Sequence, residues 1–171
     1  MSEALNAQLD PGITRTERQR RLRKAAKKIE YWQLSAQKAA RSACKLPVVA
    51  CMTFASGPDG TATIMGNRPA DLVRVAGSAG ASAVGANCGC GPENYVRVAR
   101  MLSEAGSLPV WIKPNAGLPM IRDRKTVFPM GPEEFAGFAA RLVEAGARFL
   151  GGCCGTTPAH IVALRSAVKK L

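Results

Sequence analysis

Four short apolar runs, separated by stretches with the composition of helices, constrain the fold of this chain more than any other feature of its sequence. No run is longer than eight residues, and each is almost continuously apolar, with Val, Ile, Leu, Ala and Phe predominating. Strands that are buried on both faces of a parallel sheet have this character, whereas half-exposed strands alternate. The runs that we expect to form strands are 47–54, 81–88, 109–114 and 147–154.

Proline and glycine mark the boundaries of the stretches between these runs. Proline is favoured at the first position of a helix because its nitrogen carries no hydrogen that would be left unpaired. Gly80, Gly106 and Gly146 each follow an expected helix, where a left-handed residue commonly ends it. Thr157 is placed to cap the last helix, and Asn67 is close enough to assist the first. The expected helices are 69–79, 92–105, 132–145 and 158–170, with Pro69, Pro92, Pro132 and Pro158 at their starts.

Strand, loop, helix and glycine repeat in the same order, which predicts an α/β fold made of parallel βα units. The loops that follow strands, at 54–68, 114–131 and 152–157, are longer than those that follow helices. In folds of this type the functional residues lie at the carboxyl ends of the strands. The fold hypothesis therefore places the strand ends at Thr53, Asn87–Cys88, Asn115 and Cys153–Cys154 on one face.

Residues 1–44 differ from the remainder, and we predict a basic helical segment there and a second domain over 45–171. Residues 14–43 contain neither Gly nor Pro and favour a helix, whose second half we expect to dock through Tyr31 and Trp32. The first 45 residues hold eleven Lys and Arg against four Asp and Glu, so +7 of the net charge of +12 lies there. The run from Arg18 to Lys24 could contact nucleic acid or an acidic membrane, but no aromatic residues are interleaved with it. We interpret it as a solvated helix face.

Several protein classes are disfavoured by the composition. No apolar run approaches the roughly 18 residues of a membrane-spanning helix, and the first residues lack the basic and apolar regions of a secretory signal. We therefore expect a cytoplasmic protein. Six cysteines in a reducing compartment indicate metal-binding or catalytic thiols rather than a disulfide scaffold.

Cys88 ends one expected strand, and Cys153 and Cys154 end another between glycines. Three thiolates around Zn²⁺ would leave a fourth tetrahedral position open, which is the mark of a catalytic site. Spacing alone leaves a second reading open, in which these are small buried cysteines beside glycines. Cys90 is a rival or a fourth ligand, and we expect Cys44 and Cys51 to be a loop thiol and a core thiol.

Three segments carry a resemblance to a known family. They are Gly85-Ala86-Asn87-Cys88, Lys113-Pro114-Asn115-Ala116-Gly117-Leu118-Pro119, and Gly151-Gly152-Cys153-Cys154-Gly155-Thr156-Thr157-Pro158-Ala159-His160-Ile161. In this order they resemble the homocysteine S-methyltransferase family, and most closely the homocysteine-binding domain of cobalamin-dependent methionine synthase. The resemblance covers about 45–171, which corresponds to the carboxyl-terminal half of the family's domain.

The resemblance implies about half of a (β/α)₈ barrel, with zinc held by Cys88, Cys153 and Cys154. It also implies a reaction in which a zinc-activated homocysteine thiolate accepts a methyl group and becomes methionine. The methyl donor in relatives is methylcobalamin, betaine or S-methylmethionine, so the implied partners are homocysteine and a methyl donor or a corrinoid-carrying domain. Asn87 and Asn115 are candidates for orienting the amino-acid part of the substrate.

Four strands are too few to close a barrel, which leads to further expectations. One sheet face and two edges would be left uncovered, and this predicts self-association or another chain that completes the barrel. Activity of such a chain is doubtful, so the alternative is a non-catalytic zinc-binding remnant or interaction module. His160, the one histidine, has no role in the resemblance, and we expect it to be a partly exposed helix residue.

Overall fold

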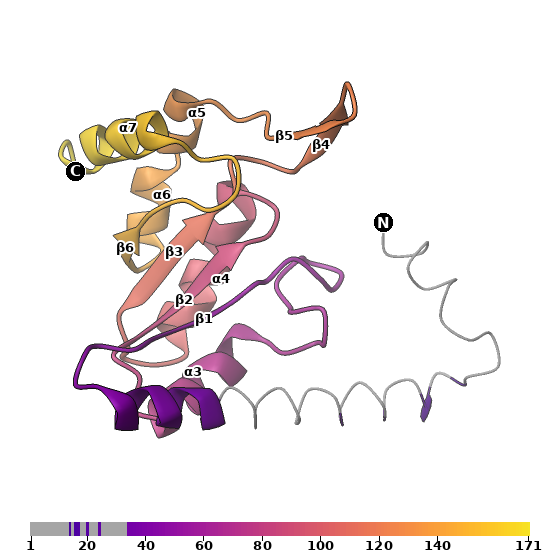
Figure 1. The fold of residues 1–171 in the computed structure, drawn as a ribbon, viewed down its shortest axis with the longest axis vertical. Helices are drawn as coiled ribbons and strands as arrows, with labels where there is room; N and C mark the ends of the chain where they lie inside the picture. The colour runs from indigo at the N-terminus through magenta and orange to yellow at the C-terminus, as the bar shows by residue number, and fades with distance from the viewer. Residues whose placement is uncertain (1–13, 15, 18–19, 21–23, 25–33) are drawn as a thin grey trace.

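A four-stranded parallel sheet forms the centre of the protein, whose computed structural model describes residues 14, 16–17, 20, 24 and 34–171 (Figure 1). The strand order is β1-β2-β3-β6, and every neighbouring pair in this sheet is parallel. This confirms the predicted α/β fold of four parallel βα units. The strands are β1 (Val49–Met52), β2 (Ala83–Cys88), β3 (Val110–Pro114) and β6 (Ala147–Leu150).

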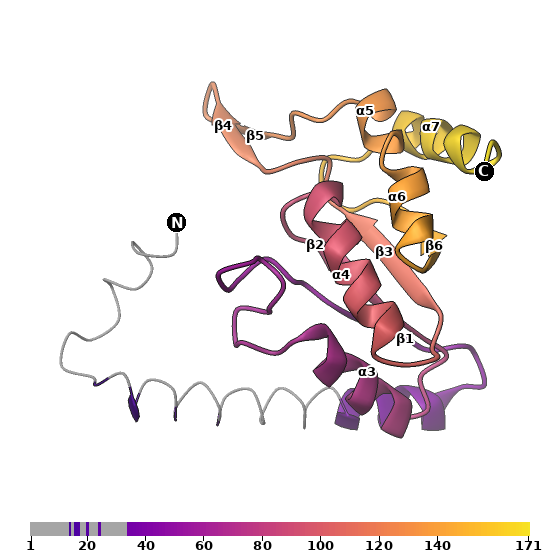
Figure 2. The ribbon, with the colours of Figure 1, turned by 180° about the vertical axis from the view of Figure 1, so that it is seen from behind.

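Three helices pack on one face of the sheet, as the view from behind shows (Figure 2). They are α3 (Pro69–Ser78), α4 (Pro92–Glu104) and α6 (Ala139–Glu144). Two further helices, α5 (Pro132–Ala136) and α7 (Pro158–Val168), pack against each other beyond the carboxyl end of the strands. The helices that follow β1, β2 and β3 therefore return over the same face, as right-handed crossovers between parallel strands do.

The two faces of the sheet have different environments. Val84 and Ile112 point toward the helices and are fully buried, together with Leu72 and Leu102 from those helices. Burying each such side chain stabilises the fold by roughly 1.5–3 kcal/mol. The opposite face carries a row in register, formed by Cys51, Gly85, Trp111 and Phe149. Phe149 is 49% exposed, so this face is much less covered by the described residues.

The predicted helix starts are confirmed, whereas some of the predicted ends and caps are not. Proline stands at the start of α3, α4, α5 and α7. Gly80 and Gly146 have positive φ as expected, but Gly106 does not, and a Cβ there would lie 2.7 Å from Cγ1 of Val73. Gly106 therefore permits close packing rather than a left-handed turn. Asn67 does not cap α3; its main chain and side chain bond to Thr63 and close the preceding loop.

Residues 114–145 depart most from the prediction. The loop after β3 contains an antiparallel hairpin, β4 (Met120–Arg122) with β5 (Lys125–Val127), that projects from the body of the protein (Figures 1 and 2). Its turn is formed by Asp123 and Arg124, which both have positive φ. The expected helix 132–145 is divided into α5 and α6 at Gly137 and Phe138.

The described part of the amino-terminal segment is helical at residues 16–17, 20, 24 and 34–43. Gln37 is buried, and Arg41 lies near Gly80 at the end of α3, so the last part of this helix packs on the sheet domain. Tyr31, Trp32 and most of the run 18–24 lie outside the described residues. Within the described part of the chain, no helix combines the length and the apolar character that crossing a membrane requires.

We predict that Gly85→Ala lowers the free energy of unfolding by roughly 1–3 kcal/mol, because its Cβ would clash with the Trp111 carbonyl oxygen and crowd Cys51 Sγ. Gly77→Ala is the matched control, since a Cβ there meets nothing within 4 Å. It lies inside α3 and should stabilise the protein by roughly 0.5–1 kcal/mol. Urea unfolding followed by circular dichroism measures both, and equal stabilities for the two variants would contradict the packing described here.

Candidate metal centre

Cys88 lies at the last position of β2, where the chain turns sharply away from the sheet. Its φ is 68°, in the left-handed region that residues other than glycine seldom adopt, and Gly89 follows with a φ of 69°. A side chain at Gly89 would collide with the hydroxyl group of Tyr95. The turn therefore depends on glycine directly after the cysteine, and it directs Cys88 toward the loop that follows β6.

Cys153 and Cys154 lie in the loop between β6 and α7. The carbonyl oxygen of Cys153 accepts hydrogen bonds from the N–H and the hydroxyl of Thr156, at 3.2 and 2.7 Å. Gly155 has a φ of 80°, and the ring of Phe128 occupies the space that a side chain there would need. These contacts close a tight turn around the cysteine pair.

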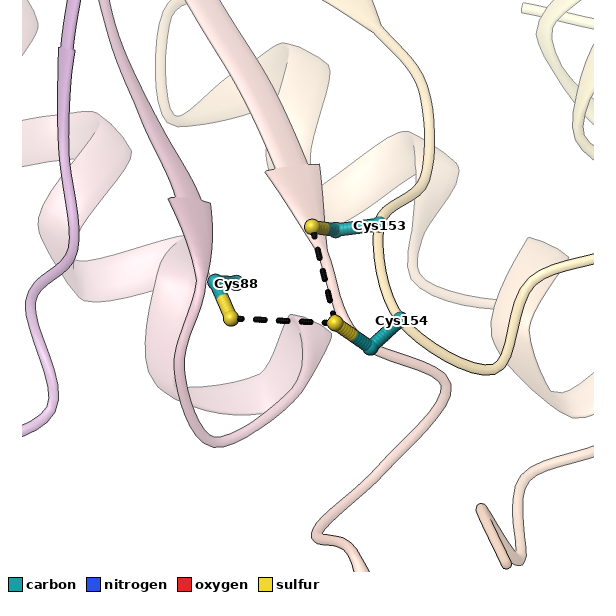
Figure 3. Close-up of side chains that lie close together, drawn as sticks. All are labelled: Cys88, Cys153 and Cys154. Atoms are coloured by element: carbon teal, nitrogen blue, oxygen red, sulfur yellow. Dashed lines mark hydrogen bonds between the residues drawn. The ribbon is translucent and has the colours of Figure 1, made fainter.

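The three sulfur atoms converge beyond the carboxyl ends of β2 and β3 (Figure 3). The Cys154 sulfur lies 3.9 Å from that of Cys88 and 3.9 Å from that of Cys153, and all three are within 4.8 Å of one another. Two sulfurs bound tetrahedrally to Zn²⁺ at about 2.3 Å are about 3.8 Å apart. The donor set and its spacing therefore fit a zinc ion with three thiolate ligands.

The three thiols influence one another's protonation. Burial acts to raise the pKa of Cys153, but hydrogen bonds from the side chain and main chain of Cys154 and from the Cys88 thiol oppose it, and the net effect is a lowered pKa. The Asn87 side chain contributes to this effect. Hydrogen bonds to Cys88 and Cys153 raise the pKa of Cys154 to about 11. Cys153 is therefore deprotonated before Cys154, and a bound divalent cation would favour the loss of the remaining protons.

The two predicted asparagines lie beside the cysteines. Asn87 is half-buried, and its carbonyl oxygen accepts a hydrogen bond from the Tyr95 hydroxyl at 2.7 Å. Asn115 is buried, and its side chain bonds to the main chain of Gly89 and Cys154 at 2.9 and 3.0 Å. These bonds do not test the predicted contact with substrate, which stays a prediction for both residues.

Tyr95, which the sequence did not mark as a candidate, lies in α4 and is fully buried. Burial raises the pKa of its hydroxyl, which therefore remains protonated and donates to the Asn87 carbonyl. Its position three residues after Pro92, on a helix that follows the cysteine strand, is the one signal that could have indicated a role near the site.

Cys90, Cys51 and Cys44 are not part of this group. Among the described residues, the only cluster of three or more potential metal-ligating side chains is Cys88, Cys153 and Cys154. Cys51 lies on β1, where burial raises its pKa against the opposing effect of Lys113. Cys44 is exposed just after the first described helix, as expected for a loop thiol.

His160 is buried, which corrects the expectation of a partly exposed residue. Its Nδ1 accepts a hydrogen bond from the Thr157 N–H at 3.2 Å, in a capping box at the start of α7. This leaves the hydrogen on Nε2, which donates to the Met130 carbonyl at 3.0 Å. The ring also packs edge-on against Phe135. His160 thus joins α7 to α5 and to the end of the hairpin loop, and is not part of the sulfur cluster.

Comparison with known proteins agrees with the motifs. A family model described as homocysteine S-methyltransferase matches residues 22–168, so the match begins within the amino-terminal segment. Methionine synthase of Mycobacterium tuberculosis is 40% identical over 93 residues, which are 54% of this chain and 8% of that protein. Homocysteine S-methyltransferase 2 of Arabidopsis thaliana is 34% identical over 86 residues, or 48% of this chain and 25% of that protein.

A solved structure shares the fold. The homocysteine methyltransferase MmuM of Escherichia coli, in its metallated form, aligns with a TM-score of 0.58 at 25% identity. The alignment covers 78% of this chain and 40% of the E. coli chain. The chain therefore spans less than half the length of each of these relatives.

We predict that His160→Ala lowers the free energy of unfolding by roughly 1–3 kcal/mol, because the Met130 carbonyl and the Thr157 N–H lose their partner. The amount of zinc bound per chain should not change. Val162→Ala, in the same helix at a position 65% exposed, is the control and should have little effect on stability. Thermal unfolding and metal analysis by plasma mass spectrometry measure the two properties. Loss of zinc by a folded His160→Ala protein would show that the histidine belongs to the metal site after all.

Proposed function

The chain belongs to the homocysteine S-methyltransferase family, and from this membership we propose that it is a zinc-dependent, homocysteine S-methyltransferase-like protein. The observation that carries the proposal is the convergence of Cys88, Cys153 and Cys154 at a spacing suited to zinc. Three thiolate ligands leave one tetrahedral position open, and structural zinc sites are closed by four protein ligands. The site is therefore suited to a substrate that binds the metal at the open position, and a thiol is such a ligand.

The proposed substrate is homocysteine and the product is methionine. Zinc bound by the three cysteines would act as a Lewis acid that favours the thiolate form of the substrate at neutral pH. The homocysteine thiol loses its proton to solvent, and its sulfur forms a bond to the methyl carbon of the donor. The bond between that carbon and the donor breaks, and the electron pair remains on the donor. Three cysteine thiolates carry more negative charge than a divalent cation neutralises, which keeps a nucleophile in this site electron-rich.

Asn87 and Asn115 are proposed to orient the amino-acid part of homocysteine. Both lie directly beside the cysteines, at the ends of β2 and β3. An amide side chain has two hydrogens to donate and an oxygen that accepts two bonds. Asn115 uses one hydrogen and one lone pair in its contacts with Gly89 and Cys154, so it retains capacity for a polar substrate.

The proposed methyl donor is methylcobalamin, betaine or S-methylmethionine. One of the relatives is named methionine synthase, which favours a donor carried by a corrinoid-containing domain or chain. The six free thiols are compatible with the reducing conditions of the cytoplasm, where we place the reaction.

A second candidate function is a non-catalytic zinc-binding remnant or interaction module. It is supported by the sheet face around Phe149, which is 49% exposed and therefore little covered by the described residues. Both candidates bind zinc, and only the first binds homocysteine at the metal.

The uncovered sheet face supports a further proposal, that two copies of the chain associate. Trp111 and Phe149 lie on this face with their ring centres 5.6 Å apart, and β1 and β6 are edge strands. Four parallel strands from each copy make the eight that a (β/α)₈ barrel contains. A second copy would pair its β6 with β1 of the first and cover the aromatic residues.

We predict that the protein binds one equivalent of zinc and that homocysteine then binds to the metal-loaded protein. Replacing any of Cys88, Cys153 or Cys154 by Ser should weaken zinc binding by more than the roughly 10–100-fold typical of losing an outer-shell partner. Cys90→Ser is the control and should bind zinc as the unchanged protein does. Chelator competition measures zinc, and calorimetry measures homocysteine. Zinc binding without measurable homocysteine binding would favour the non-catalytic candidate, and absence of zinc binding would exclude both.

For the assembly, we expect light scattering after size-exclusion chromatography to give twice the chain mass of 18.0 kDa. Phe149→Lys, placed on the uncovered face, should shift the protein toward the single-chain mass, because it adds a charge to an apolar contact. Val162→Lys is the control, since Val162 is exposed on α7 away from the sheet. A soluble protein of single-chain mass at all concentrations would count against association.

A further inference from the structure

We propose that Asn115 is a positioning residue for the metal centre, whose side-chain amide fixes the distance between Cys88 and the Cys153–Cys154 pair. This inference rests on the proposed role of the cysteines as metal ligands. Asn115 follows β3 directly and is 4% exposed. Because the sheet order is β2-β3-β6, the end of β3 lies between the two segments that carry the cysteines.

On the Cys88 side, three consecutive carbonyl groups accept hydrogen bonds from buried donors. The Tyr95 hydroxyl donates to Asn87 at 2.7 Å. The main-chain N–H of Asn115 donates to the Cys88 carbonyl at 3.3 Å, and its side-chain Nδ2 donates to the Gly89 carbonyl at 2.9 Å. Two of these three bonds come from Asn115. They hold a turn in which Cys88 has the left-handed conformation that is unfavourable for a side chain.

On the other side, the same short segment holds the cysteine pair. The N–H of Cys153 donates to the Pro114 carbonyl at 2.9 Å, and the N–H of Ala116 donates to the Cys154 carbonyl at 2.9 Å. The N–H of Cys154 donates to Oδ1 of Asn115 at 3.0 Å. A single amide group therefore donates to the Cys88 turn and accepts from the Cys154 turn.

The chemistry of this contact requires asparagine. The Gly89 carbonyl needs a donor and the Cys154 N–H needs an acceptor, and only an amide of this length offers both in one plane. Leucine has a similar size and offers neither. Aspartate retains the acceptor but places a carboxylate against the Gly89 carbonyl. Without the amide, both main-chain groups lose their partner in a buried setting.

Loss of the Asn115 amide should lower the affinity of the cysteines for zinc. The sulfurs of Cys88 and Cys154 are 3.9 Å apart, close to the separation that tetrahedral zinc needs. If the amide holds the two loops at this spacing, its loss allows them to separate, and part of the binding energy is then spent on bringing the ligands together. Outer-shell partners of metal ligands typically change affinity by about 10–100-fold, and we expect this range here.

The test compares the same substitution at two amides. Asn115→Leu removes the side-chain contacts to Gly89 and Cys154. Asn94→Leu is the control, because the Asn94 Nδ2 donates to the main-chain carbonyls of Phe54 and Gly60, and neither of these residues belongs to the cysteine loops. Both variants should lower the melting temperature of the full chain. Only Asn115→Leu should weaken zinc binding about 10–100-fold in chelator competition, and it should alter the visible absorption of the Co²⁺-substituted site. Asn94→Leu should stay within twofold of the unchanged protein, with the same Co²⁺ spectrum.

Asn115→Asp provides the decisive second variant if Asn115→Leu does not fold. An added negative charge near the site would by itself strengthen the binding of a cation, so weaker binding by Asn115→Asp supports the loss of positioning. The inference would be overturned if the Asn115→Asp variant had the same zinc affinity and the same Co²⁺ spectrum as the unchanged protein. It would also be overturned if Asn115→Leu and Asn94→Leu had equal affinities. Failure of the unchanged protein to give sulfur-to-cobalt absorption would instead refute the metal centre of the proposed function.

Discussion

Parallel strands of one sheet end at the same edge, and this constraint brings together cysteines that are 66 residues apart in the chain. β2 carries Cys88 to that edge, and the loop after β6 carries Cys153 and Cys154. These two strands are not neighbours, because β3 lies between them. The main chain that continues from β3 therefore has to join the two cysteine loops, and residues 114–116 do so through hydrogen bonds to both.

Much of the fold could be predicted because its signals are local. The apolar runs located the four strands, and proline located the helix starts, since both depend on the preferences of single segments. The division of 132–145 into α5 and α6 could not be predicted, because it follows from packing α5 on α7 while α6 packs on the sheet. The β4–β5 hairpin also lacked a clear signal. Its turn uses Asp123 and Arg124 rather than the Asn-Gly or Asp-Gly pair that marks such turns.

The sequence could indicate which cysteines form the candidate site, but not which residues support them. Spacing and chemistry left the three cysteines open between metal binding and simple burial, and the family motifs decided for metal. The roles of Tyr95 and His160 depend on tertiary contacts. Tyr95 donates a hydrogen bond to the turn of Cys88, and His160 bonds to Met130, which is 30 residues away in the chain. A pattern within the sequence does not show which main-chain carbonyl a distant side chain will reach, so the hydrogen bonds that hold the site emerge only from the fold.

The candidate metal centre and the proposed substrate surface depend on different parts of a barrel. All of the hydrogen bonds described here that position Cys88, Cys153 and Cys154 join residues between Asn87 and Thr156. They need only β2, β3, β6 and α4, all of which are present. The inner sheet face around Trp111 and Phe149, in contrast, is what further strands of a complete barrel would cover. The arrangement of the three cysteines is thus a local property of the described chain. The proposed pocket for homocysteine would in contrast need a surface beyond these four strands, which the proposed second copy of the chain could supply.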